Sequence, residues 1–232
     1  MNKSINNLEG REHWEIASKA LADEGFTLGS KISYTARHSL HGLLFILARY
    51  KFVMKMMSNR KNLTLVDLGC NDGFGDLMLL QNLDVKSFYG VDFDEEAITW
   101  ANNNITGENV QFINSDFLGM DICLGGADCI YSLDVIEHIP SEHESLYLDT
   151  ICKNLKDDGV AIIGTPNIKM YQYANEVNKK VHINNYSQER LHDALSERFN
   201  NVFIFGMNDE VLHTGFYPMS CYVMALCCGK KK

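Results

Sequence analysis

The sequence is short of the basic residues that a nucleic-acid-binding protein needs. It has 21 lysines and arginines against 30 acidic residues, which gives 232 residues a net charge of −9. A protein that binds a phosphate backbone needs a concentrated basic face, and the only basic run is Lys230, Lys231 and Lys232. We therefore expect no nucleic-acid partner, and a small-molecule ligand is favoured.

The chain also lacks a disulfide framework, a zinc-type cysteine pattern and an uninterrupted apolar span. None of its seven cysteines forms a C-x-x-C pair, and most stand inside apolar runs, as reduced thiols do. The first 15 residues have no apolar signal-peptide core, and the apolar segment 43–57 is interrupted by Arg49, Lys51 and Lys55. These features predict a cytoplasmic protein with no membrane span.

Apolar runs alternate with helical patterns along most of the chain. Near-continuous apolar strands separated by helices are typical of a parallel sheet covered on both faces. The last two apolar runs are separated by only 11 residues, which is too short for a helical crossover, so we expect an antiparallel pair. The expected strands are residues 63–68, 87–93, 109–116, 127–136, 159–166, 201–207 and 219–228, and the expected helices between them are residues 74–83, 94–105, 141–155 and 187–199.

This order predicts an α/β fold with a seven-stranded, mostly parallel sheet that ends in an antiparallel pair. Residues 61–232 would form this domain. In residues 1–60, apolar side chains from Ser33 to Met57 recur at helical spacing, which predicts an N-terminal helical lid. The helix 141–155 is expected to begin with a capping box formed by Ser141 and Glu144.

A glycine-rich turn follows the first expected strand in the stretch VDLGCNDGFGD, residues 66–76. A glycine loop between a strand and a helix lets the backbone approach a ligand at the helix N-terminus. Asp67, just before the glycines, would repel a pyrophosphate but hold an ammonium group. Asp92, at the end of the second strand, can accept both ribose hydroxyls, and Asp116, after the third, can accept an adenine amino group. An adenosine with a cationic head satisfies all three, which points to S-adenosylmethionine rather than to the nicotinamide cofactor of a dehydrogenase. The alternative for each acid is a helix cap or turn residue.

The same residues resemble the class I S-adenosylmethionine-dependent methyltransferases over about residues 62–228. VDLGCNDGFG matches the first motif of that family, YGVDFD the second, NSDF the third, YSLDVIEHIP the fourth, and LKDDGVAIIGTPN the following segment. One departure is Asn71, where the family has glycine, and asparagine tolerates the left-handed conformation better than most residues. The resemblance implies a Rossmann-like sheet and the product S-adenosylhomocysteine. It implies a cofactor site formed by Asp67, Gly69, Asn71, Gly73, Asp92, Phe93, Asp116, Phe117 and Leu133.

The segment SLDVIEHI resembles that of small-molecule O-methyltransferases, and the asparagine-proline-proline-tyrosine motif of N-methylating relatives is absent. The C-terminal loops resemble methyltransferases of bacterial surface-polysaccharide (capsule or lipopolysaccharide) biosynthesis, which modify sugars or a phosphoramidate. The resemblance thus implies a sugar-nucleotide or phosphorylated acceptor. A quinone-precursor O-methyltransferase and a non-catalytic S-adenosylmethionine-binding protein are the alternatives.

Methyl transfer to an unactivated hydroxyl needs alignment and a base. We expect His213 to be this base, oriented by Asp209 and Glu210, with His138 and His182 as further candidates. No metal is expected, and the alternative is a Mg²⁺ site formed by Asp134, Glu137 and His138. The candidate substrate-binding residues are Tyr34 and Arg37 in the lid, with His38 beside them, and Asn184, Asn208 and Glu210 in the loops.

Overall fold

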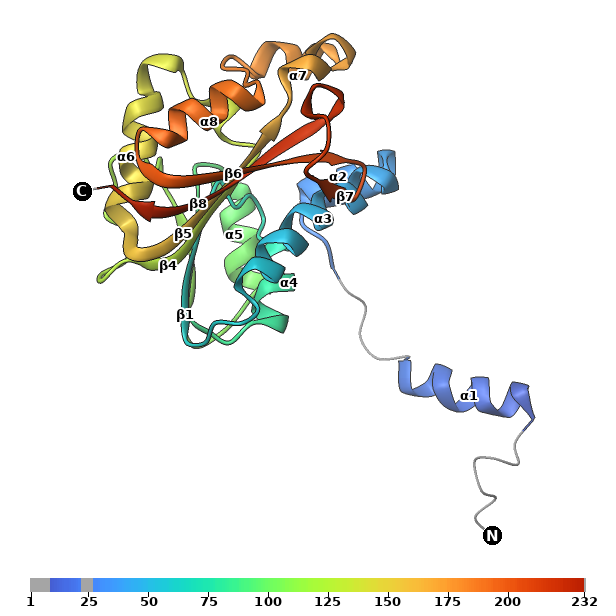
Figure 1. Ribbon diagram of the computed structural model, residues 1–232. Helices are drawn as coiled ribbons and strands as arrows, with labels where there is room; N and C mark the ends of the chain where they lie inside the picture. Colours follow the sequence, from blue (N-terminus) through green and yellow to red (C-terminus); the bar gives the residue numbers. More distant parts are fainter. Residues whose placement is uncertain (1–8, 22–26, 232) are drawn as a thin grey trace.

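The computed structural model describes residues 9–21 and 27–231 (Figure 1). Residues 1–8 and 22–26 of the expected lid, and Lys232 of the basic run, lie outside the described residues.

A single mixed sheet forms the centre of the molecule, in the strand order β3-β2-β1-β4-β5-β8-β6-β7. The first five strands are parallel, and β8 lies antiparallel between β5 and β6. The α/β class and the antiparallel C-terminal strands are thus confirmed. The strands are β1 (Leu63–Leu68), β2 (Val85–Asp92), β3 (Val110–Asn114), β4 (Ala127–Leu133), β5 (Leu155–Pro166), β6 (Phe199–Asn208), β7 (Val211–His213) and β8 (Tyr222–Lys230).

The sheet has eight strands, so the expected number of seven is wrong by one. The additional strand is β7, which folds back on β6 and pairs Gly206 with His213 and Asn208 with Val211. Asp209 adopts a left-handed conformation, φ +49°, in the tight turn between them. The connection that is too short for a helical crossover is long enough for a hairpin.

Helices cover both faces of the sheet, as the apolar strands predict (Figure 1). Side chains of α6 and α8 pack with Val66, Ile130 and Ile163 into the core on one face. Side chains of α3, α4 and α5 pack with Leu65, Phe88 and Tyr131 into the core on the other face. The helices are α1 (Gly10–Leu21), α2 (Ser30–His38), α3 (Leu40–Met57), α4 (Phe74–Asn82), α5 (Glu95–Asn104), α6 (Glu144–Asn154), α7 (Glu176–Val181) and α8 (Gln188–Ser196), with 3₁₀ turns η2 (Ile136–His138), η3 (Ser141–His143), η4 (Ile168–Tyr173) and η5 (Tyr217–Met219).

The segment expected to be helical from Ser33 to Met57 is two helices, α2 and α3. Ser39 ends α2 and caps α3, and its side chain accepts a hydrogen bond from the Gly42 amide at 2.9 Å. Tyr50, Val53 and Met57 of α3 are buried in the core. Helix α3 is therefore built into the domain, and α2 is the element that projects over the edge of the sheet where the parallel strands end.

The expected capping box of the helix after β4 does not form. Ser141 lies in the turn η3, and α6 begins at Glu144 without a side-chain cap. The Glu144 carboxylate instead pairs with Arg190 at 2.7 Å and accepts a hydrogen bond from Tyr186. Tertiary partners on α8 and the preceding loop thus replace the local cap.

Across the described residues, the longest and most apolar helices fall short of what a membrane crossing requires.

Candidate active site

The glycine loop after β1 has the conformation that its sequence requires. Gly69 and Gly73 have φ of +86° and +71°, and Asn71, in the place of the family glycine, has φ of +51°. The expectation that asparagine preserves the loop is confirmed. A Cβ atom on Gly69 would lie 2.3 Å from Val135 Cγ2, so that position admits glycine alone. The Gly69 amide donates to the carbonyl of Val91, which fixes the loop against β2.

Asp92 lies at the end of β2 and links the loop to the next helix. One carboxylate oxygen accepts a hydrogen bond from the Asn71 amide and the other from the Asp94 amide, both at 2.9 Å. Each oxygen keeps a second lone pair for a ligand hydroxyl. Phe93 beside it is 80% exposed, as an open stacking surface would be.

The end of β3 lies beside Asp92, because Asp92 pairs with Asn114 in the parallel register. Asp116 follows two residues later; it is exposed and accepts a hydrogen bond from the Leu118 amide at 3.0 Å. Phe117 is buried in the core. The structure therefore brings Asp92, Phe93 and Asp116 to one edge and turns Phe117 inward.

Asp67 lies beneath the loop and is fully buried. Its carboxyl accepts a hydrogen bond from Tyr50 at 3.1 Å, and its neighbour Asp76 accepts one from Tyr131 at 2.5 Å. Burial, and then the proximity of Asp76, raises the pKa of Asp67 well above its usual value, and burial raises the pKa of Asp76 to about 7. One carboxyl oxygen of each acid has no other partner among the described residues, so we infer that the two acids share a proton.

Helix α2 covers the loop. Asp72, which is buried, accepts hydrogen bonds from the amides of Ile32 at 3.4 Å and Phe74 at 3.3 Å, and so joins the starts of α2 and α4. Lys31 pairs with Asp94 at 3.1 Å. The expected lid residues Tyr34, Arg37 and His38 are exposed, and the rings of Tyr34 and His38 stack on each other at 4.1 Å.

A cavity of about 240 Å³ lies between α2, α3 and the glycine loop. Lys31, Ile32 and Thr35 of α2 line it in place of Tyr34 and Arg37. Its other walls are Ile46, Arg49, Tyr50, Gly69, Cys70, Asn71, Asp72, Phe74, Gly75, Leu133 and Asp134. Asp67 lies below this cavity, and Asp92 and Asp116 lie on the adjoining strand ends.

Arg49 and Asp134 form an ion pair on the wall of this cavity. Arg49 is 5% exposed and lies over the rings of Phe45, at 5.1 Å, and Tyr222, at 4.8 Å. Burial opposes its charge, but the Asp134 carboxylate together with Tyr222 and Tyr50 outweighs this and raises the pKa of Arg49 above its usual value. Asp134 has a left-handed backbone, φ +59°, which turns the chain at the end of β4 toward Arg49.

A second cavity of about 470 Å³ begins on the other side of this ion pair. Arg49 and Asp134 line both cavities. Aromatic rings and side-chain amides make up much of the remaining wall, together with one acid and one imidazole. The residues are Phe45, Glu137, Pro166, Asn167, Met170, Tyr171, Tyr173, Ala174, Asn178, His182, Asn185, Cys221 and Tyr222. We call this the acceptor cavity and the first the loop cavity.

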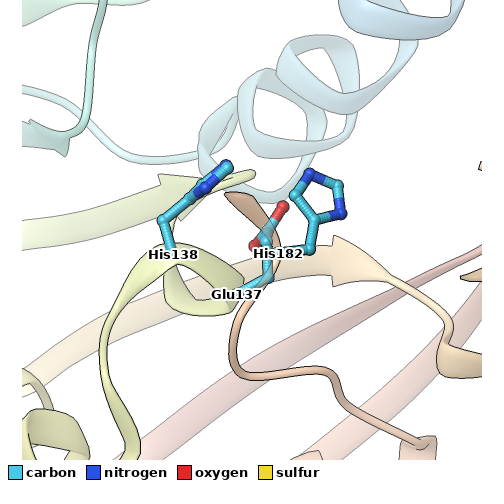
Figure 2. Close-up of side chains that lie close together, drawn as sticks. All are labelled: Glu137, His138 and His182. Carbon is cyan, nitrogen blue, oxygen red and sulfur yellow. The ribbon is translucent and has the colours of Figure 1, made fainter. Parts of the chain in front are cut away.

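Glu137, His138 and His182 lie close together (Figure 2), and Glu137 and His182 of this group line the acceptor cavity. One ligand atom from each lies within 4.8 Å of the others, although His182 comes from the loop after α7. The His138 Nδ1 lies 3.0 Å from the Val181 carbonyl, so it carries a proton and leaves Nε2 as the lone-pair nitrogen. Burial, and then His138, lowers the pKa of His182, and burial, followed by Asp134, raises the pKa of Glu137 to about 8.

The structure replaces one member of the alternative metal set. Asp134 is engaged with Arg49, and His182 takes its place beside Glu137 and His138. Oε2 of Glu137 accepts a hydrogen bond from Thr165 at 2.9 Å, while the buried Oε1 has no partner among the described residues. A free buried oxygen beside two imidazoles suits a divalent cation, and two nitrogen donors favour a transition metal over Mg²⁺.

His213 lies away from both cavities, on the hairpin strand β7. Its Nδ1 accepts a hydrogen bond from the Gly215 amide at 3.1 Å. Asp209, expected to orient it, pairs instead with His41 of α3 at 2.9 Å.

The remaining candidate substrate residues also lie outside the walls of the cavities. The amide of Asn184 donates to Glu144 and Tyr186, and Asn208 accepts from the Cys221 amide at 2.8 Å. Glu210 is exposed in the β6–β7 turn. Asn185, the residue after Asn184, does line the acceptor cavity.

Several residues that build the site were not expected from the sequence: Arg49, Tyr50, Asp72 and Asp76. Arg49 could have been found from the sequence, because it is a charged residue within an apolar helical run. Asp76 is an acid in the first turn of a helix, and this pattern is equally typical of a surface residue, so it did not indicate a buried site.

The profile of the methyltransferase domain matches residues 36–201, which is most of the chain. The chain belongs to the methyltransferase domain family. A curated relative, sphingolipid C9-methyltransferase 2 of Gibberella zeae, is 25% identical over 167 residues. That match covers 64% of this chain and 31% of the relative, so the chain spans about a third of the relative's length.

This chain shares its fold with solved structures of methyltransferases. A putative methyltransferase in complex with the Trm112 activator of Haloferax volcanii superposes with a TM-score of 0.69 at 14% identity, covering 88% of this chain and 100% of that one. The plantazolicin methyltransferase BpumL, in complex with a triazolic desmethylPZN analog and SAH, gives 0.65 at 14% identity, with 87% and 90% covered. The small RNA methyltransferase HEN1 gives 0.64 at 18% identity, with 79% and 25% covered.

Proposed function

We propose that this chain is an S-adenosylmethionine-dependent O-methyltransferase that acts on a hydroxyl of a small-molecule acceptor. The observation that carries the proposal is the meeting of two cavities at Arg49 and Asp134. One lies against the glycine loop, where a methyltransferase holds its cofactor, and the other ends in groups that can take a proton.

The loop cavity is the proposed place of the methionine part of the cofactor. Gly69 and Asn71, both with positive φ, line this cavity and would bring the loop backbone to the ligand. The Arg49 guanidinium is the fixed positive charge for its carboxylate. Asp134, which lines the cavity, is the fixed negative charge for its ammonium in place of Asp67, the residue expected to hold it, because Asp67 is fully buried and does not line the cavity. The adenosine part would extend along the strand ends, with Asp92 at the ribose, Phe93 on the adenine face and Asp116 at the adenine amino group.

The acceptor cavity is the proposed place of the methyl acceptor. Tyrosine rings and the amides of Asn167, Asn178 and Asn185 line it. Rings offer flat apolar faces, and amides bond hydroxyls as donors or acceptors. Such walls suit a sugar, so we keep a sugar nucleotide or a phosphorylated precursor of a surface polysaccharide as the proposed acceptor, with a quinone precursor as the alternative.

His182 is the proposed general base. It lines the acceptor cavity, and its lowered pKa keeps the imidazole neutral and able to accept the hydroxyl proton. The base turns the hydroxyl into a better nucleophile as its oxygen attacks the methyl carbon in line with the departing sulfur. His138 stays the second candidate, and His213 the third, because its Nδ1 is already engaged on β7.

A metal-assisted reaction is a second proposal that the free Oε1 of Glu137 favours. Glu137, His138 and His182 would hold the cation, which would supply Lewis-acid polarisation of the acceptor oxygen when bound. Calorimetric titration with Mn²⁺ and Zn²⁺ tests this directly. The wild type should bind the cation and the Glu137→Gln variant should not. If the wild type binds neither cation, the metal-assisted reaction is wrong and His182 acts as a general base alone.

The proposed cofactor is tested by mass spectrometry of the purified protein, followed by calorimetry with S-adenosylmethionine and S-adenosylhomocysteine. Both should bind, and NAD should not. A screen of sugar nucleotides, phosphorylated sugars and quinone precursors for production of S-adenosylhomocysteine then identifies the acceptor. Cofactor binding without turnover on any of these classes would contradict the proposed acceptor but not the cofactor.

A further inference from the structure

The segment 168–183, which we call the rim segment, forms part of the acceptor cavity. It contains η4 and α7 and follows β5 directly after Asn167. On its inner side Met170, Ala174 and His182 line the cavity. The rim segment is therefore both a wall of the acceptor cavity and a stretch of the outer surface.

The outer side of the rim segment is unusually apolar for a solvated surface. Val177 is 68% exposed and Ile183 59%, and Ile168 and Val181 are also exposed, and none of these four lines the acceptor cavity. Exposed apolar side chains that stand singly need no explanation, but a group of them on one short segment marks an interaction site.

The apolar group continues onto a second segment that lies against the first. Asn167 donates from its side chain to the Tyr217 carbonyl and from its amide to the Cys221 carbonyl, both at 3.1 Å. These bonds hold the turn η5 beside the start of the rim segment. Phe216 and Met219 at the two ends of this turn are 72% and 71% exposed.

Lysines accompany these apolar side chains. The rim segment contains Lys169, Lys179 and Lys180 against one acid, Glu176, so it carries a net charge of +2 in a chain of −9. Lys179 pairs with Glu176 at 3.1 Å, and Lys169 and Lys180 are exposed. The positive charge is thus concentrated where the apolar side chains are exposed, while the rest of the chain is acidic.

We propose that the rim segment and the turn η5 dock this chain peripherally onto an anionic lipid bilayer. Apolar and aromatic side chains enter the headgroup region of a bilayer, and neighbouring lysines are attracted by anionic headgroups. The two features occur together on this surface. An uncharged apolar partner would use only the apolar side chains, and a polar acidic partner would use only the lysines. Because the docked segment is a wall of the acceptor cavity, docking would hold this cavity beside the bilayer, where a lipid-borne acceptor is at hand.

The test is co-sedimentation of the wild-type chain with vesicles, without any acceptor. Vesicles of phosphatidylcholine alone are compared with vesicles in which about one third is phosphatidylglycerol, an anionic lipid. Binding should require the anionic lipid and weaken with salt, because screening shortens the range of the attraction. Failure to bind the anionic vesicles, or equal binding to both kinds, would overturn the proposal.

Two double variants separate the charges from the apolar side chains. Lys169→Gln with Lys180→Gln should weaken binding about five-fold for each lysine removed. Val177→Ser with Ile183→Ser should weaken it at least ten-fold, since two exposed side chains no longer enter the bilayer. Leu124→Ser with Leu146→Ser is the matched control, because it removes two exposed leucines that lie on other elements.

All three variants should bind S-adenosylmethionine as the wild type does, which shows that the fold is intact and keeps this test independent of the proposed reaction. If the control variant loses as much vesicle binding as the rim variants, the association is non-specific and the proposal is wrong. Loss of vesicle binding in the rim variants alone supports it, whatever acceptor the enzyme uses.

Discussion

Arg49 of α3 is ion-paired with Asp134 at the end of β4, on the wall that both cavities share. The arginine is buried, whereas the Asp134 side chain is 38% exposed. A helix that precedes the sheet in sequence therefore supplies the one arginine on these cavity walls, and two rings hold it in place.

Arg49→Met should lower the affinity for S-adenosylmethionine about ten-fold or more, because the cofactor carboxylate loses a charged partner. The unfolding free energy should fall by about 1–3 kcal/mol, which is less than for a fully buried pair because Asp134 reaches water. Calorimetry and urea denaturation measure the two effects. The double variant Arg49→Met with Asp134→Asn should recover part of the stability but none of the affinity, and full recovery of affinity would remove Arg49 from the cofactor site.

Asp92→Ala should weaken S-adenosylmethionine binding by about 1.5–3 kcal/mol, the usual worth of hydrogen bonds to a charged group. Stability should also fall, because the carboxylate accepts the amides of Asn71 and Asp94. Calorimetric titration checks the affinity, with Asp116→Ala as the comparison. Asp116 bonds one amide and is exposed, so its loss should cost less. An Asp92→Ala variant with unchanged affinity would place the ribose elsewhere.

His182→Ala should reduce turnover about 10²–10⁴-fold, the usual range for loss of a general base, while cofactor affinity stays as in the wild type. The assay follows S-adenosylhomocysteine production with the acceptor found by the screen. His213→Ala is the matched control on β7 and should retain turnover within a few-fold. The reverse result would assign proton abstraction to His213.

Asp76→Asn should change how stability depends on pH. Burial raises the pKa of Asp76 to about 7, from a usual value of 3.8. The folded state therefore binds a proton that the unfolded state has released between these values, so this contribution is full below pH 3.8 and is lost as pH rises through 7. Asparagine cannot ionise, so the variant should gain stability relative to the wild type at pH 8, by on the order of a few kcal/mol, and gain little at pH 4.

Urea denaturation at both pH values measures this difference. Tyr50, Tyr131 and Cys70 face the acid pair and all stay neutral in this range, because burial raises each pKa well above its usual value. The carboxylates of Asp72 and Asp92 also act on the pair, and both remain in the variant. Equal pH dependence in the variant and the wild type would show that the two acids do not share a proton.

The sequence predicted the sheet and the glycine loop because both depend on local patterns. The strand 63–68 agrees with β1, and the left-handed Asn71 agrees with the expected loop. The hairpin strand β7 was missed because three residues carry no pattern of their own. The capping box failed because Glu144 found stronger partners in Arg190 and Tyr186.

The site was less predictable than the fold, because its side chains converge from distant segments. His182 lies beside Glu137 only through the path of the loop after α7, which no spacing in the sequence reveals. Tyr34 and Arg37, expected to meet the substrate, do not line the loop cavity, and Ile32 and Thr35 of the same helix line it instead. Amphipathic spacing gives the two faces of a helix but not which ligand each face meets.

The position of β8 bears on how the chain can be synthesised. The last strand in sequence lies between β5 and β6, and β6 and β7 reach the rest of the sheet only through it. During translation, β6 and β7 must therefore wait with unpaired edges until residues 222–230 leave the ribosome. Exposed edges of this kind invite aggregation, and pairing between distant strands is slow. A C-terminal tag or truncation at this strand should therefore harm folding yield far more than an equal change at α1, none of whose described side chains lies in either core.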